Sequence, residues 1–77
     1  MKLQFDAEEM GKKIEHYRKQ RGMTRADLAS AIGCSQQAIS ILECGNADPR
    51  LSGITNIANA LGVEPSWLLA WKPEDEE

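Results

Sequence analysis

The stretch "ADLASAIGCSQQAISILECG", residues 26–45, determines the fold of this chain. It places a small residue, Ala29, four positions before a glycine, Gly33, and two apolar residues in core phase, Ile39 and Leu42, after it. A turn at this glycine is too tight to leave the flanking helices parallel, and a steep, close crossing requires a small side chain such as alanine. The spacing therefore predicts two short helices joined as a helix-turn-helix.

One local pattern, an apolar residue on each side of a helix N-cap, starts four of the predicted helices. Two of the caps, Asp6 with Glu9 and Thr24 with Asp27, are predicted to form capping boxes. The first, third and fourth predicted helices cover residues 7–20, 35–44 and 51–61. The second is about two turns long and lies between Thr24 and Gly33. The last begins at Pro65, includes Trp67, Leu68 and Trp71, and ends at Pro73. No segment is predicted to be a strand.

The predicted architecture is an all-α, compact five-helix bundle over residues 1–72, followed by an acidic tail at residues 73–77. Cys34 and Cys44 would lie about 15 Å apart along one helix, beyond the reach of a disulfide. Together with the single histidine, His16, they show no metal-ligand spacing, so no metal and no cofactor are expected. Cys34 is expected to be buried as the apolar N-cap neighbour of the third helix.

The net charge of −3 argues at first against a nucleic-acid partner, but four of the acidic residues lie in the tail. The remaining body carries nine basic and eight acidic residues, and six of the bases lie close together in the sequence: Lys12, Lys13, Arg18, Lys19, Arg21 and Arg25. The local field there is expected to be basic. No apolar run approaches the roughly 20 residues of a membrane span, and no signal peptide is recognisable, so a cytoplasmic protein is expected.

Two stretches, "IEHYRKQRGMTRADLASAIGCSQQAISILECG" and, after Pro49, "IANALGVEPSWLL", resemble the phage repressor and Cro type of helix-turn-helix domain, the lambda repressor-like XRE family. The resemblance covers about residues 10–70, and it implies a bacterial or phage-encoded protein that binds double-stranded DNA. In that family the second helix of the motif enters the major groove and its N-terminal residues touch base edges.

At that end of the third helix stand Gln36 and Gln37. A glutamine amide carries a donor beside an acceptor and matches N7 and N6 of adenine, so half-sites that contain adenine are expected. The alternative is that the two glutamines are ordinary solvated residues. Ile41 is predicted either to pack on a thymine methyl group or to be a surface residue without a role, and Ser40 is a weaker candidate for a base contact.

Phosphate contacts are predicted from the starts of the second and third helices and from the loop after the third: Thr24, Arg25, Ser35, Asn46 and Arg50. Either arginine could instead be an ordinary solvated side chain, and Asp48 in the same loop would repel phosphate.

Arg18 and Glu43 both fall in phase with apolar core positions of their helices. Two buried charges are costly unless they pair, so they are predicted to form a structural ion pair that orients the third helix. Trp67 falls where the resemblance implies a core tryptophan. An aromatic residue at the end of the last helix is a candidate dimer contact, and the predicted contact residues are Val63, Ser66, Leu69 and Trp71.

The predicted function is a sequence-specific transcriptional regulator, a repressor that binds a palindromic operator as a homodimer with helix 35–44 in the major groove. The alternative is an antitoxin-like or bridging subunit of the same fold, whose partner is a toxin or the transcription machinery and which docks through the acidic tail. No nucleophile, base and orienting group can be assembled, so an enzyme is not expected.

Overall fold

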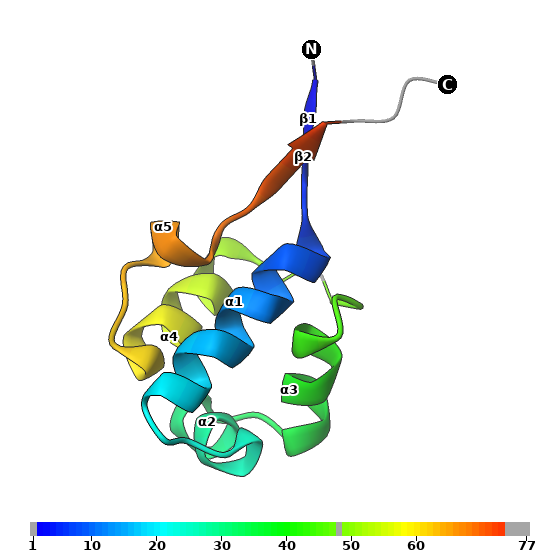
Figure 1. The fold of residues 1–77 in the computed structure, drawn as a ribbon. Helices are drawn as coiled ribbons and strands as arrows, with labels where there is room; N and C mark the ends of the chain where they lie inside the picture. The colour runs from blue at the N-terminus through cyan, green and yellow to red at the C-terminus, as the bar shows by residue number, and fades with distance from the viewer. Residues whose placement is uncertain (1, 48, 74–77) are drawn as a thin grey trace.

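The structure is a computed structural model that describes residues 2–47 and 49–73. Five helices form a compact body from which the two ends of the described chain extend as a short ribbon (Figure 1). The elements in chain order are β1 (Leu3–Phe5), α1 (Ala7–Gln20), α2 (Arg25–Ile32), α3 (Gln36–Glu43), α4 (Leu51–Leu61), α5 (Pro65–Leu68) and β2 (Trp71–Pro73). The five-helix prediction is confirmed, whereas the prediction of no strands was wrong.

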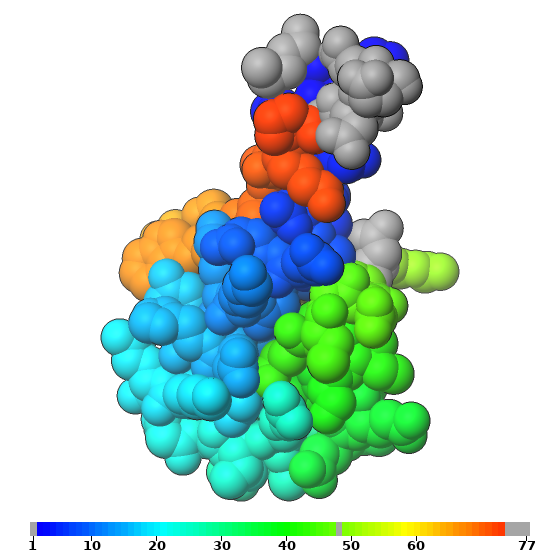
Figure 2. Space-filling view, turned by 45° about the vertical axis from the view of Figure 1, so that its right-hand side comes forward, coloured from blue at the N-terminus to red at the C-terminus, as the bar shows by residue number. Residues whose placement is uncertain are grey.

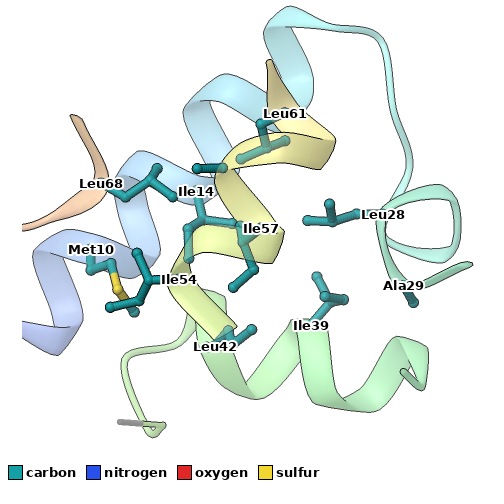
Figure 3. Close-up of a cluster of buried hydrophobic side chains, with 11 residues drawn as sticks. Met10, Ile14, Leu28, Ala29, Ile39, Leu42, Ile54, Ile57, Leu61 and Leu68 are labelled. Atoms are coloured by element: carbon teal, nitrogen blue, oxygen red, sulfur yellow. The ribbon is translucent and has the colours of Figure 1, made fainter. Parts of the chain in front are cut away.

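A single apolar core lies at the centre of the body, and every helix contributes to it. Figure 3 shows side chains from α1 and α4 meeting those from α2 and α3. The largest fully buried side chains are Met10, Ile14, Leu28, Ile39, Leu61 and Leu68. Since these residues come from all five helices, no helix can leave the body without exposing apolar surface.

The turn between α2 and α3 has the predicted geometry. Gly33 lies in the left-handed region at φ 76°, and the backbone N–H of Cys34 donates to the carbonyl of Ala29 at 2.9 Å. The predicted capping box at Thr24 and Asp27 is confirmed, because each side chain accepts from the backbone N–H of the other. The backbone N–H of Thr24, which donates to the Asp27 carboxylate at 2.9 Å, is the main group that stabilises its ionised form and lowers the pKa of Asp27.

The helix α1 approaches the end of α3 unusually closely at Gly11. A Cβ atom on this buried glycine would lie 2.6 Å from the carbonyl oxygen of Leu42 and 2.7 Å from that of Glu43. Only a residue without a side chain fits between the two backbones. The sequence pattern predicts no role for this glycine.

A buried carboxylate joins three helices next to this crossing. Glu43 on α3 accepts from Nε of Arg18 on α1 at 2.7 Å and from Nε of Arg25 at the start of α2 at 2.9 Å. Arg18 also donates to the other carboxylate oxygen at 3.3 Å and to the backbone carbonyl of Met23 at 2.8 Å. The carboxylate is therefore fully enclosed by charged donors, as a buried charge must be.

The C-terminal part of the chain differs from the prediction. The last helix ends at Leu68, and Trp71 belongs to β2, which pairs antiparallel with β1. The strand pairing also changes the first cap: Asp6 accepts from the N–H of Glu9, but its own N–H donates to Ala70 at 2.8 Å instead of completing a box. Of the predicted acidic tail, residues 73–77, only Pro73 lies within the described residues.

Two expectations about burial were wrong. Cys34 is exposed, and it lies in the turn between α2 and α3. Trp67 is 50% exposed, because α5 is only one turn long and turns Leu68, rather than Trp67, into the core. The ring of Trp67 lies beside that of Tyr17 on the surface, with 6.1 Å between ring centroids.

Replacing Gly11 by alanine should destabilise the fold. The new methyl group would meet two backbone oxygens, so α1 must shift, and we expect the free energy of unfolding to fall by about 1–3 kcal/mol. Gly53→Ala is the matched control, because its Cβ would meet only Pro49 at 3.6 Å. Alanine should stabilise α4 by up to about 1 kcal/mol. Urea denaturation measures both, and equal effects would contradict the close approach at Gly11.

Neutralising Glu43 should have a larger effect. Glu43→Gln leaves the Arg18 guanidinium buried without a counter-charge, so we expect a loss of about 3–5 kcal/mol in the free energy of unfolding. Glu15→Gln is the control, because Glu15 pairs with Lys19 at the surface at 3.2 Å. Such a pair contributes less than about 1 kcal/mol. Similar small losses in the two variants, again by urea denaturation, would show that the buried pair is unimportant.

Candidate nucleic-acid interface

The helix α3 lies along one side of the molecule, with α2 at its N-terminal end and the loop to α4 at its C-terminal end (Figure 1). Its inward face is held by Ile39, Leu42 and Glu43, all buried. The opposite face is not covered by any other described element, and Figure 2 shows α3 in green at the surface beside α1. A helix fixed on one face and bare on the other can enter a groove as a rigid body.

The two glutamines stand at the start of this bare face. Gln36 and Gln37 are the first two residues of α3 and both are exposed. Neither amide makes a side-chain hydrogen bond to any residue within 2–47 and 49–73. The helix starts at a fixed place, because the hydroxyl of Ser35 accepts from the N–H of Ala38 at 3.1 Å. Both amides are therefore available to a ligand at a well-defined position.

The next turn of α3 presents Ser40 and Ile41. Ser40 is half-buried, and Ile41 is 41% exposed. Part of the Ile41 side chain borders an apolar hollow of about 330 Å³ between α3 and α4, which is also lined by Leu42 and Ile57. The sequence pattern does not predict this hollow, because its walls come from helices that are separated in the sequence.

The residues predicted to contact phosphate are found at both ends of α3. Thr24 and Ser35 are exposed N-caps whose hydroxyl oxygens each accept a backbone N–H, and the Ser35 hydroxyl still has its own O–H to donate. Asn46 and Arg50 are exposed beyond the other end of the helix. Asp48, which was expected to repel phosphate, lies outside the described residues.

Arg25 is the most constrained of these residues. Its Nε donates to Glu43, so the guanidinium is held against α3, yet 40% of the side chain stays exposed. The hydrogen bond to the Glu43 carboxylate, together with its charge, raises the pKa of Arg25. This arginine therefore keeps its charge at a defined place, but Glu43 already balances part of that charge.

The six clustered bases do not form one free basic surface. Arg18 is buried, Lys13 donates to the carbonyl of Leu69 at 3.0 Å, and Arg21 donates to that of Leu61 at 3.2 Å. These three side chains connect α1 to other parts of the body. The basic charge near residues 12–25 therefore contributes to holding the fold, and less of it faces solvent than the sequence suggested.

The predicted dimer contacts do not form one patch. Val63 and Leu69 lie on either side of α5 and are half-buried, and Ser66 lies within α5 and is exposed. Trp71 lies instead on the ribbon, where its ring meets that of Phe5 edge to face with 5.9 Å between centroids.

The described residues form neither a metal site nor a membrane span. Among the described residues, no group of three or more histidine, cysteine or acidic side chains is placed to hold a metal ion. None of the described helices has the length and apolar character needed to cross a membrane.

Comparison with known proteins supports the resemblance. The sequence model of the helix-turn-helix family HTH_3 matches residues 14–68. An uncharacterised HTH-type transcriptional regulator of Methanocaldococcus jannaschii is 35% identical over 68 residues, which cover 88% of this chain and 100% of that protein. An SPbeta prophage-derived uncharacterised HTH-type transcriptional regulator of Bacillus subtilis is 30% identical over 59 residues, which cover 77% of this chain and 55% of that protein.

Among solved structures, the restriction-modification controller protein C.AhdI from Aeromonas hydrophila has a TM-score of 0.78 at 27% identity, over 82% of this chain and 96% of that one. The family match spans the turn at Gly33 and the whole of α3. With a family match over more than half of its length, the chain belongs to the helix-turn-helix family of XRE type and is a DNA-binding transcriptional regulator.

Proposed function

We propose that this chain is a sequence-specific repressor that binds a palindromic operator as a homodimer, with α3 in the major groove. The observation that carries the proposal is the pair of exposed, unpaired amides of Gln36 and Gln37 at the N-terminal end of a helix whose other face is buried. In this position a glutamine can bond N7 and N6 of one adenine at the same time. Ser40 and Ile41 would face the next base pairs, and Ile41 would meet a thymine methyl group.

The phosphate contacts follow from the two ends of α3. Thr24, Ser35 and Arg25 would contact the backbone on one side of the groove, and Asn46 and Arg50 the backbone on the other side. Such contacts fix the register of the helix but carry no sequence information. Because Glu43 holds Arg25 against α3, a phosphate bound there would fix the depth of the helix in the groove.

A dimer is proposed because one recognition helix reads only one half-site. Two copies related by a two-fold axis read a palindrome whose half-site centres lie one helical turn or a multiple of it apart. A repressor of this kind acts by covering a promoter, and it works where the DNA is, in the cytoplasm. The role is binding rather than catalysis. The names of the relatives, both of them transcriptional regulators and one prophage-derived, support this role and a phage or prophage origin.

Selection of bound duplexes from a random library tests base reading. The wild-type chain should select a palindrome with adenine at one position of each half-site, and Gln37→Ala should relax that position by about 1–3 kcal/mol of discrimination. Gln20→Ala, an exposed glutamine at the end of α1, is the matched control and should leave the motif unchanged. If no motif emerges, the repressor proposal fails and the bridging or antitoxin-like role, with a protein partner, takes its place.

The salt dependence of binding tests the phosphate contacts. Arg50→Ala should weaken binding to all sequences alike and reduce the slope of log K against log salt by about 0.9, the value for one lost phosphate contact. Lys72→Ala is the control, because Lys72 is an exposed base on β2, in the ribbon that extends away from the helical body (Figure 1). Fluorescence anisotropy over a range of salt concentrations gives both slopes. An unchanged slope in Arg50→Ala would remove this residue from the interface.

A further inference from the structure

The ribbon of β1 and β2 extends away from the helical body (Figures 1 and 2). Within the described residues the two strands form a sheet only with each other. Each strand has three residues, and a two-stranded ribbon is marginally stable by itself in water. More strands, or a partner on its apolar face, would stabilise it.

The pairing register shows which backbone groups of the ribbon are free. Strand residues pair as Leu3 with Pro73, Gln4 with Lys72 and Phe5 with Trp71. Just below the ribbon the N–H of Asp6 donates to Ala70 at 2.8 Å in the same register. Because hydrogen-bonded and non-bonded pairs alternate in an antiparallel ladder, Gln4 and Lys72 form the next bonded pair. The N–H and C=O groups of the residues on either side point outward.

The two outer edges of the ribbon are therefore different. The edge of β1 offers both N–H and C=O groups, at Leu3 and Phe5. The edge of β2 lacks one donor, because Pro73 has no N–H, and proline is a common means of blocking an edge strand. A hollow of about 470 Å³ runs along the base of β1, lined by Gln4, Phe5 and the loop at Gly45–Ala47, and it includes no residue of β2.

The side chains of the ribbon are also sorted by face. Partners in a pair point to the same face, and neighbours along a strand to opposite faces. Leu3, Phe5, Trp71 and Pro73 therefore share one face, and Gln4 and Lys72 share the other. Leu3 is 59% exposed and Trp71 is 58% exposed. The ribbon thus carries an apolar face that the described part of the chain leaves largely uncovered.

We propose that two copies of this chain dimerise by pairing β1 with β1 in antiparallel order, which gives one continuous four-stranded sheet. The inference rests on the proposed function, because it states how the two halves of the regulator meet. The two-fold axis passes by Gln4, so Leu3 of each copy lies opposite Phe5 of the other. In each of these two pairs, the backbone N–H of one residue donates to the C=O of the other, in both directions.

A second copy is the occupant that this edge fits. In antiparallel order the outward donors and acceptors of β1 match those of an identical strand, as a closed two-fold contact requires. The residues that face each other at the axis are neutral glutamines, so no like charges meet there. Leu3 and Phe5 of the two copies also become neighbours on the apolar face. That face then runs without interruption across both ribbons.

Disulfide trapping tests the register. Gln4→Cys, in a chain that also carries Cys34→Ser and Cys44→Ser, places two cysteines across the axis with Cα atoms about 4.5 Å apart, within disulfide range. Lys72→Cys in the same background is the matched control, because residue 72 lies on the same face but on the outer strand. We expect mild oxidation to give a covalent dimer of the first variant much faster than of the second. Equal rates would overturn the proposal.

A proline at the edge tests the hydrogen bonds. Leu3→Pro removes an N–H that the ribbon itself does not use, whereas Leu3→Ala removes the side chain and keeps the N–H. Because two hydrogen bonds are lost per dimer, sedimentation equilibrium should show a dimer dissociation constant about tenfold to a hundredfold higher in Leu3→Pro than in Leu3→Ala. Near-UV circular dichroism from the Phe5 and Trp71 pair verifies that the ribbon is intact.

A monomeric wild-type chain would overturn the proposal. Equal dimer dissociation constants for Leu3→Pro and Leu3→Ala would overturn it too, because the dimer contact would then lie elsewhere, for instance around α5. The oxidation and sedimentation measurements contain no DNA, so they decide the dimer contact even if the operator selection fails. If both proposals hold, Leu3→Pro should lose affinity for a duplex with two half-sites and bind a single half-site as the wild type does.

Discussion

The carboxylate of Glu43 is the contact on which the arrangement of α1, α2 and α3 depends. It is the only acidic side chain among the described residues that is buried, and it bonds one arginine from each of the two other helices. A charge in this position is unfavourable unless all of its partners are present. The helix that bears the candidate base contacts is therefore fixed against both of its neighbours at once, next to the place where Gly11 lets the backbones touch.

Along α3, the residues that pack against the body are different from the residues proposed to contact DNA bases. The residues that hold the helix, Ile39, Leu42 and Glu43, alternate with those that face outward, and no residue serves both purposes. Arg25 is the one connection between the two sets, because it bonds the buried carboxylate and still exposes part of its guanidinium. A change in the outward residues can thus alter the sequence that is read while the core stays as it is.

The predictions that were confirmed rest on local signals. Caps such as Thr24 and stops such as Gly33 act on residues within one turn, so the limits of the first four helices follow from short stretches of sequence. The pairing of Arg18 with Glu43 could also be predicted, because an isolated charge in core phase needs a partner. What the outward side of α3 binds rests on family resemblance as well as on these patterns.

The features that were missed depend on residues far apart in the sequence. A three-residue strand is too short to show an alternating pattern, and β1 meets its partner only when the two ends of the described chain come together. The exposure of Trp67 and Cys34 depends on how neighbouring elements end, and the role of Gly11 depends on a backbone 31 residues away at Leu42. The carbonyls that accept from Lys13 and Arg21 lie on other elements too.

The pairing of Leu3 with Pro73 has a practical consequence for handling this protein. A purification tag or fluorescent protein fused to either terminus would leave the body through the same ribbon, on the side away from the start of α3 (Figure 1). Such a fusion leaves the candidate base contacts clear but crowds the edge of β1.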